Sequence, residues 1–340
     1  MKNVTIDDVA DHAGVSKSTV SAVINDRDVV KHTTRQRVLD SIEQLDYRPR
    51  GSARRGFQAP NGPSIGFVIK EADNPYYSEV LLGIQSVTDQ HDYLTFVSSS
   101  EGDFGAEKKI IKQFSNKDLS GLIITPILNE DTDLSHIFEL KRNNIPFVLL
   151  EGVQGIRAPL VDIDNVRASS DAVRHLIELG HENIVHFAGP EYSKHSQERI
   201  EGVRRAFSRS PLIYGDEAIV EAGDSFEAGY EAARDYFSDP GADATAVTCY
   251  NDLVALGAMK ALRELDLAVP DDVSVVGFDD LKLLDYFPLP LTTVRVPKRE
   301  MGARAADLLH QQVQGHTTDA CRRVSLDAEL VVRSSTTPPH

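Results

Sequence analysis

The first fifty-odd residues most constrain what this chain can fold into, because their apolar side chains recur at helical spacing on both sides of a glycine. Spacing of three and four residues predicts one apolar face of a short helix, formed by Ile6, Val9, Ala10 and Ala13. Thr5 offers a hydroxyl cap at the start of that helix, and the acids after it suit the first turn. Gly14 is expected to end the helix, because glycine enters a left-handed turn without steric cost.

A second short helix is predicted after the glycine. Ser16 caps it, and Val20 and Val23 face inward. Its outward face carries small or polar side chains, namely Lys17, Ser18, Ser21 and Ala22. Two short helices joined by a tight turn describe a helix-turn-helix unit, whose second helix fits a DNA major groove. A generic helical hairpin is the alternative that these residues leave open.

A third helix and a basic segment follow. We expect Thr33 and Thr34 to cap this helix, and its inner face to hold Val38, Leu39, Ile42 and Leu45. The helix should end before Pro49, because the residue preceding a proline avoids helical geometry. Residues 47–60 contain no acid and four arginines, Arg48, Arg50, Arg54 and Arg55. This composition predicts a basic hinge.

The run TIDDVADHAGVSKSTVSAVIND, with TRQRVLDSIEQLDYRP after it, resembles the lactose-repressor/galactose-repressor (LacI/GalR) family. The resemblance implies a repressor whose dimer places two second helices in successive major grooves of a pseudo-palindromic operator and its hinges at the minor groove. It implies DNA contacts from the helical residues Thr5, Ser16, Lys17, Ser18, Thr19, Ser21, Ala22, Asn25 and His32. It also implies contacts from the hinge residues Tyr47, Arg50, Ala53, Arg54, Arg55 and Phe57.

The second helix departs from the family pattern at positions that usually read bases. Lys17 and Ser18 hold two of them, and Ala22 stands where the family often has arginine. Alanine contacts a thymine methyl group but makes no bidentate contact to guanine. We therefore expect a half-site that differs from the common one of the family.

The hinge departs further. The family pattern has a leucine that wedges into the minor groove, where this chain has Gly56. Gly51 and Gly56 each lower helix propensity by roughly 1 kcal/mol relative to alanine. We expect a hinge that is disordered away from DNA, relies on its arginines, and uses Phe57 as a substitute wedge.

Charge separates this N-terminal region from the rest of the chain. The net charge is −16, yet residues 1–57 carry ten Lys and Arg against eight Asp and Glu. An acidic body would confine DNA contact to the basic part, although a merely soluble surface is the alternative. No secretory signal or run of eighteen apolar residues is evident, so we expect a cytoplasmic, nucleoid-associated bacterial protein without membrane contact. Cys249 and Cys321 form no metal or redox motif.

Beyond the linker 58–63, short apolar runs alternate with amphipathic helical patterns, which predicts parallel sheets covered on both faces. The alternation restarts near residue 160, so the fold class is expected to be α/β: an all-α helix-turn-helix domain followed by two lobes resembling a periplasmic binding protein. The expected divisions are 1–48 for the DNA reader, 49–62 for the hinge, and 63–340 for an effector-binding and dimerisation body. Lobe 1 is expected at about 63–159 and 293–320, and lobe 2 at about 160–291 and 321–340.

Several residues are candidates for a ligand site in the cleft between lobes, because ligands of open α/β sheets bind beyond the carboxyl ends of the strands. Tyr76 and Tyr77 follow the first strand and could stack on a sugar ring, or else pack as loop aromatics. By the family resemblance, Arg199 matches an effector-contacting arginine and Asp279 an acceptor of ligand hydroxyls. Weaker candidates are Ser193, His195, Phe226 and Asn251, the last of which also suits a helix cap.

The site composition suits a polyhydroxylated neutral ligand. A ligand-responsive regulator of carbohydrate genes, acting as a homodimer without a cofactor, is the function we favour. A regulator that responds to a nucleobase or nucleoside, or a sugar-binding protein with accessory helices, is the alternative. No nucleophile with its base, metal spacing or phosphate loop is evident, so we do not expect an enzyme.

Overall fold

The computed structural model describes residues 5–24, 30–45, 63–117, 119–128, 133–191, 193–213, 215–286, 288–316 and 322–340. The chain divides into two compact units between Gly62 and Pro63. Neither Asn25 nor the hinge residues from Tyr47 to Phe57 belong to the described part, so the expectations placed on them lie outside it.

The first unit consists of helices packed around a small apolar core. Its described helices are α1 (Ile6–Ala13), α2 (Lys17–Ile24) and α3 (His32–Gln44). Most residues expected to face inward are buried, namely Val9, Ala10, Ala13, Val20, Val23, Val38 and Ile42, and the other three, Ile6, Leu39 and Leu45, are partly buried against them. The helical periodicity of the sequence therefore predicted this core correctly.

The second unit has two lobes, each built on a sheet of six strands among the described residues. In lobe 1 the strand order is β11 (Arg323–Leu326), β5 (Leu160–Ile163), β4 (Phe147–Leu149), β3 (Gly121–Ile124), β1 (Ser64–Ile69) and β2 (Leu94–Ser99). Neighbouring strands in this sheet are parallel. The helical elements of the lobe are α4 (Pro75–Thr88), η1 (Asp89–His91), α5 (Phe104–Ser115), α6 (Ser135–Arg142) and α11 (Lys298–Val313).

Lobe 2 repeats this plan. Its strand order is β12 (Glu329–Val331), β10 (Thr292–Arg295), β9 (Ser274–Asp279), β8 (Ala246–Cys249), β6 (Ile184–Ala188) and β7 (Ile219–Glu221). Only the β10–β12 pair among these is antiparallel. The helical elements are α7 (Asn165–Leu179), α8 (Lys194–Phe207), η2 (Asp216–Ala218), α9 (Phe226–Phe237), α10 (Asp252–Glu264) and η3 (Lys282–Tyr286).

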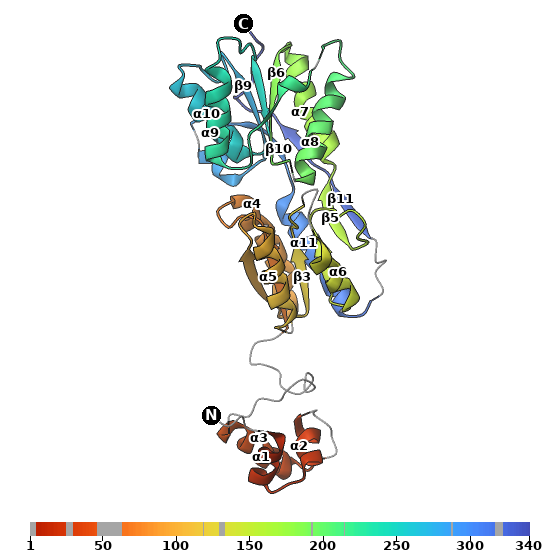
Figure 1. Ribbon diagram of the computed structural model, residues 1–340. Helices are drawn as coiled ribbons and strands as arrows, with labels where there is room; N and C mark the ends of the chain where they lie inside the picture. The colour runs from red at the N-terminus through yellow and green to blue at the C-terminus, as the bar shows by residue number, and fades with distance from the viewer. Residues whose placement is uncertain are drawn as a thin grey trace. The chain divides into compact units, whose positions relative to one another are not determined.

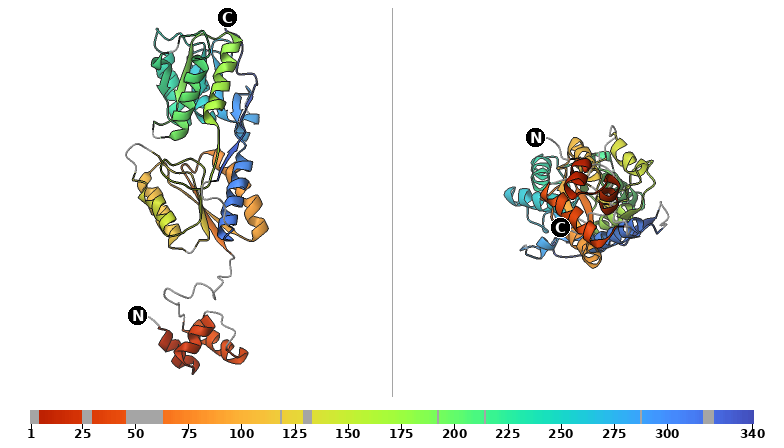
Figure 2. Two further views of the ribbon diagram at one scale, coloured as in Figure 1. Left: turned by 90° about the vertical axis from the view of Figure 1, so that its right-hand side faces the viewer. Right: turned by 90° about the horizontal axis from the view of Figure 1, so that it is seen from below.

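Helices pack in pairs on the faces of the sheets, and glycines allow the closest approaches. Figure 2 shows α4 and α11 side by side on one face of the lobe 1 sheet. A Cβ atom at Gly83 would collide with the backbone of Arg299, and one at Gly302 would collide with the backbone of Val80. These two glycines thus let α4 and α11 cross at backbone distance.

The chain crosses between lobes at three described places, and these differ from the expected boundaries. The crossings lie between β5 and α7, between β10 and α11, and between β11 and β12. The expected boundaries were therefore wrong in three strands: β5 and β11 belong to the lobe 1 sheet, and β10 belongs to the lobe 2 sheet. Strands that pair with one another can be distant in sequence. The local sequence pattern of one strand therefore does not show to which of the two sheets it belongs.

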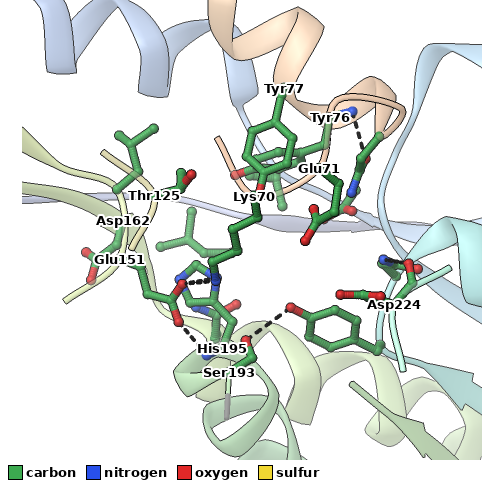
Figure 3. Close-up of a pocket in the computed structure, with 18 of the residues that line it drawn as sticks. Lys70, Glu71, Tyr76, Tyr77, Thr125, Glu151, Asp162, Ser193, His195 and Asp224 are labelled. Carbon is green, nitrogen blue, oxygen red and sulfur yellow. Dashed lines mark hydrogen bonds and ion pairs between the residues drawn. The ribbon is translucent and has the colours of Figure 1, made fainter. Parts of the chain in front are cut away.

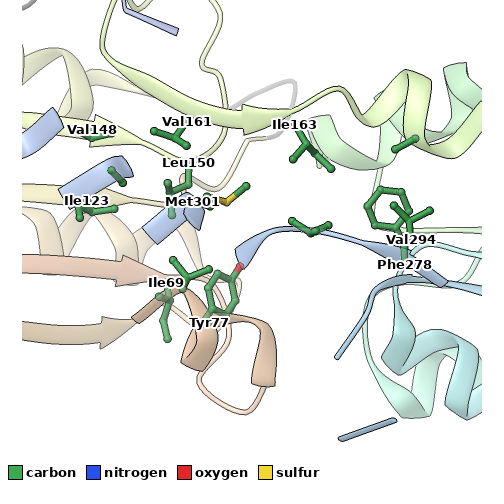
Figure 4. Packing of buried hydrophobic residues seen from close by; sticks show 14 of the residues in the cluster. Ile69, Tyr77, Ile123, Val148, Leu150, Val161, Ile163, Phe278, Val294 and Met301 are labelled. Carbon is green, nitrogen blue, oxygen red and sulfur yellow. The ribbon is translucent and has the colours of Figure 1, made fainter. Parts of the chain in front are cut away.

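A single apolar cluster continues from the lobe 1 core across these crossings into lobe 2. Figure 4 shows Ile123 and Val148 at one end, Ile163 between the lobes, and Val294 with Phe278 at the other end. Parallel crossing strands with a shared core allow the lobes to rotate about a hinge. Among the described residues, no helix is long and apolar enough to span a membrane.

Candidate functional site

In the first unit, α2 lies at the exposed surface and directly follows the turn at Gly14. Thr5 caps α1 as expected, and its hydroxyl and the carboxylate of Asp8 form a reciprocal capping box. Gly14 adopts φ +64°, the left-handed conformation expected for this turn. The Oγ of Ser16 accepts a hydrogen bond of 3.2 Å from the amide of Thr19, which fixes the start of α2.

The residues predicted to read bases lie on the outer face of α2. Lys17 and Ser18 are exposed, and Ser21 and Ala22 are half-buried. The Nζ of Lys17 lies 3.0 Å from an Asp7 carboxylate oxygen, so a base contact by Lys17 would require this exposed pair to open. The hydroxyl of Thr5 already takes part in the cap of α1. The DNA contact predicted for Thr5 would therefore have to come from its other atoms.

The third helix starts earlier than expected. It begins at His32, and Thr33 and Thr34 lie inside its first turn, so the prediction that they cap it was wrong. The amide of Arg35 bonds to the carbonyl of Lys31, which places the start of the helix before the threonines. His32 is exposed at this helix start, where a DNA backbone contact remains a prediction.

In the second unit, the carboxyl ends of strands from both lobes converge on one cavity of about 60 Å³. Lys70 and Glu71 follow β1, and Glu151 follows β4. From lobe 2, Tyr250 and Asn251 follow β8. The convergence follows from the parallel sheets, whose strands end at the same edge.

A buried ion pair lies on one side of this cavity. The Nζ of Lys70 is 2.5 Å from an oxygen of Glu151, whose side chain is only 1% exposed. Burial favours the neutral form of Glu151, but the charges of His195 and Lys70 outweigh it and hold the pKa of this carboxyl at about 2. The backbone amide of His195 also donates to Glu151 at 3.3 Å, which links α8 of lobe 2 to lobe 1.

Arg199 occupies the centre of the site from α8. Its Nε donates to the Oδ1 of Asn165 at 3.2 Å, and its Nη1 donates to the carbonyl of Tyr250. The guanidinium lies 4.7 Å from the ring centre of Tyr250 and 3.6 Å from that of Phe278. Stacking and hydrogen bonds together hold this group in one orientation.

Asp279 faces Arg199 at the end of β9, with 3.9 Å between the Nη2 and the Oδ1. Its φ of 113° lies in the left-handed region, and the next residue, Asp280, has φ 54°. The Nζ of Lys298 donates hydrogen bonds to the carbonyl oxygens of both residues. A buried ammonium group from lobe 1 thus stabilises the strained backbone that orients a cavity carboxylate of lobe 2.

The structure brings most predicted effector residues to the cavity, namely Tyr76, Tyr77, Ser193, His195, Arg199, Asn251 and Asp279. Tyr76 bonds to the sulfur of Met301 at 3.2 Å, whereas Tyr77 is also part of the apolar core. Asn251 both caps α10 through Val254 and donates to the carbonyl of Asp224 at 2.8 Å.

Phe226 was expected at the cavity and is not there. It is 39% exposed and lines a separate apolar hollow with residues of α9 and α10. Ser225 caps α9, so the chain turns between Asp224 and Phe226 and sends their side chains in different directions. Asp224 enters the cavity instead.

Comparisons with known proteins agree with this geometry. Residues 5–50 match the family described as bacterial regulatory proteins, lacI family, and residues 173–336 match a periplasmic binding protein-like domain. The HTH-type transcriptional repressor PurR of Aliivibrio fischeri (strain ATCC 700601 / ES114) is 34% identical over 338 residues, which cover 97% of this chain and 98% of that protein. The chain belongs to the lacI family of bacterial regulatory proteins.

Two solved structures extend the likeness of this lacI-family protein. The lac repressor dimer bound to operator and an anti-inducer has 28% identity and a TM-score of 0.72, with coverage of 99% of this chain and 100% of that one. The transcriptional regulator CelR in complex with cellobiose also has 28% identity and a TM-score of 0.72, with coverage of 98% and 99%. The chain is thus a DNA-binding transcriptional repressor with an effector-binding domain, and not an enzyme.

Sequence reasoning missed several cavity residues of this repressor, notably Lys70, Glu71, Glu151, Asp224 and Tyr250. Most of them directly follow strands that the apolar runs had located. The rule that ligands bind beyond strand ends would have selected Lys70, Glu151 and Tyr250. Nothing in the local pattern indicates that Glu71 and Asp224 share one cavity, because they come from different lobes.

Proposed function

We propose that this repressor binds a pseudo-palindromic operator as a homodimer, and that a sugar or sugar derivative in the interlobe cavity sets its operator affinity. Its targets would be genes of carbohydrate utilisation. The observation that carries the proposal is the cavity itself, which combines a fixed guanidinium, carboxylates and tyrosines. Such a set binds hydroxyl groups by donating and accepting hydrogen bonds at the same time.

The comparison with CelR supports a sugar, because that regulator was solved with cellobiose. Tyr76 and Tyr250 offer ring faces on which the apolar face of a pyranose can pack. A nucleobase could also stack on these rings, and it is the competing ligand class. A nucleobase would gain less from the carboxylates, because it offers fewer hydrogen-bond donors than a sugar with a hydroxyl group on most of its carbons.

A cavity of about 60 Å³ is smaller than ligand pockets, which usually measure ~300–1,000 Å³. Ligand entry therefore requires the lobes or their side chains to separate. A ligand that prefers one lobe arrangement shifts the population toward it, and this shift would change the fraction of dimers able to bind DNA.

The dimer is supported by apolar side chains exposed on two helical segments of the body. On α4 Leu82 is 48% exposed, and on η3 Tyr286 is 82% exposed. Burial of such side chains against a second copy would stabilise a dimer. The structure of the lac repressor on its operator is likewise a dimer. A repressor that reads DNA in this way would work in the bacterial cytoplasm.

A thermal-shift screen of neutral sugars, sugar phosphates and nucleobases tests the ligand class. We expect a sugar or sugar derivative to raise the unfolding temperature of the whole chain, and Arg199→Lys to abolish that rise. The variant Arg174→Lys, on the exposed face of α7, is the matched control. Stabilisation by nucleobases alone would reject the sugar proposal and favour the competing class.

Selection of binding sites from random DNA tests the reader. We expect a two-fold related site whose half-sites lack the guanine contact that arginine makes at the position of Ala22. Recovery of the usual family site with that guanine retained would contradict the assignment of Ala22 to base contact.

A further inference from the structure

The charges that line the interlobe cavity do not balance. Three of the acids have cationic partners. Lys70 pairs with Glu151 at 2.5 Å, and Arg199 faces Asp279 at 3.9 Å. Asp162 also lines the cavity and pairs with Arg323 at 2.8 Å. Glu71 and Asp224 remain, and neither forms an ion pair with a lysine or arginine within the described part of the chain. Lys70, already paired with Glu151, is a cation whose charge favours the ionised form of both. The cavity thus holds a surplus of negative charge on one side.

The two unpaired carboxyl groups come from opposite lobes. Glu71 follows β1 of lobe 1, and Asp224 lies between β7 and α9 of lobe 2. In Figure 3 both reach into the cavity on the side away from Glu151. Their backbones are fixed, since Asn251 holds the carbonyl of Asp224 at 2.8 Å and Asn74 caps α4 directly after Glu71.

The negative charge of Asp224 disfavours the ionised form of Glu71. Burial, and after it the charge of Asp224, raises the pKa of Glu71 to about 7. Burial also raises the pKa of Asp224. A cation between them would favour both ionised forms and would stabilise the closed arrangement of the lobes.

We propose that the effector carries a protonated amino group that binds between Glu71 and Asp224, while its hydroxyl groups bind Arg199 and Asp279. The ligand class is an amino sugar or another amine-bearing polyol. This inference rests on the proposed function, because it names the chemistry of the same cavity. Anionic derivatives such as sugar phosphates are disfavoured, since the surplus charge repels them.

An organic ammonium group fits this site better than a metal ion. Calcium takes six to eight oxygen ligands, and no group of three or more metal-ligating side chains occurs among the described residues. An ammonium group needs only two or three acceptors, which two carboxylates supply. A charge-assisted bond of this kind corresponds to about a 10- to 100-fold gain in affinity.

The test compares matched ligands by isothermal titration calorimetry on the whole chain. The pairs are glucose with glucosamine, galactose with galactosamine, and mannose with mannosamine, and calcium chloride is a separate arm. We expect at least one amino sugar to bind about tenfold or more tightly than its hydroxyl partner. The double variant Glu71→Gln/Asp224→Asn should lose this preference, whereas Glu182→Gln, on an exposed loop, should keep it.

The variant also supplies a readout that does not depend on the ligand. Removing the repulsion between two facing carboxyls should leave the unfolding temperature of the ligand-free protein unchanged or higher. Neutral sugars that bind as tightly as their amino partners would overturn this inference and leave the proposed function intact. Binding of calcium alone would overturn it in favour of a metal, and binding of none of these ligands would reject the sugar class as well.

The pH dependence provides a second test. Glu71 is faced by Asp224, Lys70, Asn74 and Tyr77, and its pKa in the ligand-free protein is about 7. An ammonium group binds the ionised form, so its binding should release protons from Glu71 and should strengthen between about pH 5 and pH 7, where the amino group of the ligand also stays protonated. Titrations in two buffers of different ionisation enthalpy measure this release. Proton uptake, or no pH dependence in wild type, would contradict the inference.

Discussion

The DNA-reading unit and the interlobe cavity place their functional side chains in opposite environments. On α2 the side chains predicted to meet DNA are exposed or half-buried, and Lys17 pairs with the exposed Asp7. In the second unit, Lys70 and Arg199 at the cavity and Lys298 beside Asp279 are buried and bonded to other parts of the protein. Substitutions on the outer face of α2 should therefore change DNA binding alone, whereas those of the buried cations should change ligand binding and stability together.

The largest effect should come from breaking the Lys70–Glu151 pair. Lys70→Met leaves the Glu151 carboxylate buried without its closest cation, which should cost about 3–5 kcal/mol of the free energy of unfolding. Urea unfolding of the whole chain measures this loss. The double variant Lys70→Met/Glu151→Leu should recover most of it, and a single variant as stable as wild type would contradict the comparison.

A smaller loss is expected at Lys298, whose ammonium group donates hydrogen bonds to the carbonyl oxygens of Asp279 and Asp280. Lys298→Met should destabilise the protein by about 2–3 kcal/mol, because hydrogen bonds to a buried charged group are lost. It should also weaken ligand binding, since Asp279 loses its fixed orientation. The exposed neighbour Arg299→Met is the control, and equal effects of both substitutions would argue against this role.

The cap of α1 should contribute less. Thr5→Ala removes the hydroxyl of the capping box and should lower the stability of the first unit by about 1 kcal/mol. Thr5→Ser keeps the hydroxyl and should be nearly neutral. Thermal unfolding followed by circular dichroism distinguishes the two variants. An alanine variant as stable as wild type would show that the cap does not stabilise the first unit.

The smallest change in stability is expected on the outer face of α2. Lys17→Ala should leave the free energy of unfolding within about 0.5 kcal/mol of wild type. Its operator affinity should fall nonetheless, and the salt dependence of binding should become weaker if Lys17 contacts phosphate. Fluorescence anisotropy at several salt concentrations measures both. An unchanged affinity would place Lys17 outside the interface.

The same contrast explains how far the sequence predicted the molecule. In the reader, helical spacing identified the buried Val9, Val20 and Val38, because a short helix buries residues that are close in sequence. The start of α3 was missed by two or three residues, since helix ends depend on capping geometry that a run of two threonines does not specify.

In the body, the alternation of strands and helices predicted the two lobes but assigned β5 to the wrong one, because pairing with β4 and β11 joins distant segments. Arg199 and Asp279 were predicted through the family resemblance. Glu71 and Asp224 were not, since their meeting depends on how two lobes face each other across the cavity. No single stretch of the sequence indicates non-local contacts of this kind.

The most direct test of the account is operator binding by the whole chain during a titration with the ligand found by thermal shift. The account predicts that this ligand changes the operator Kd by at least about fivefold, the lower end of typical coupling between sites. Arg199→Lys should abolish that response and leave ligand-free operator binding unchanged. A ligand that binds the cavity but leaves the operator Kd unchanged would contradict the central claim.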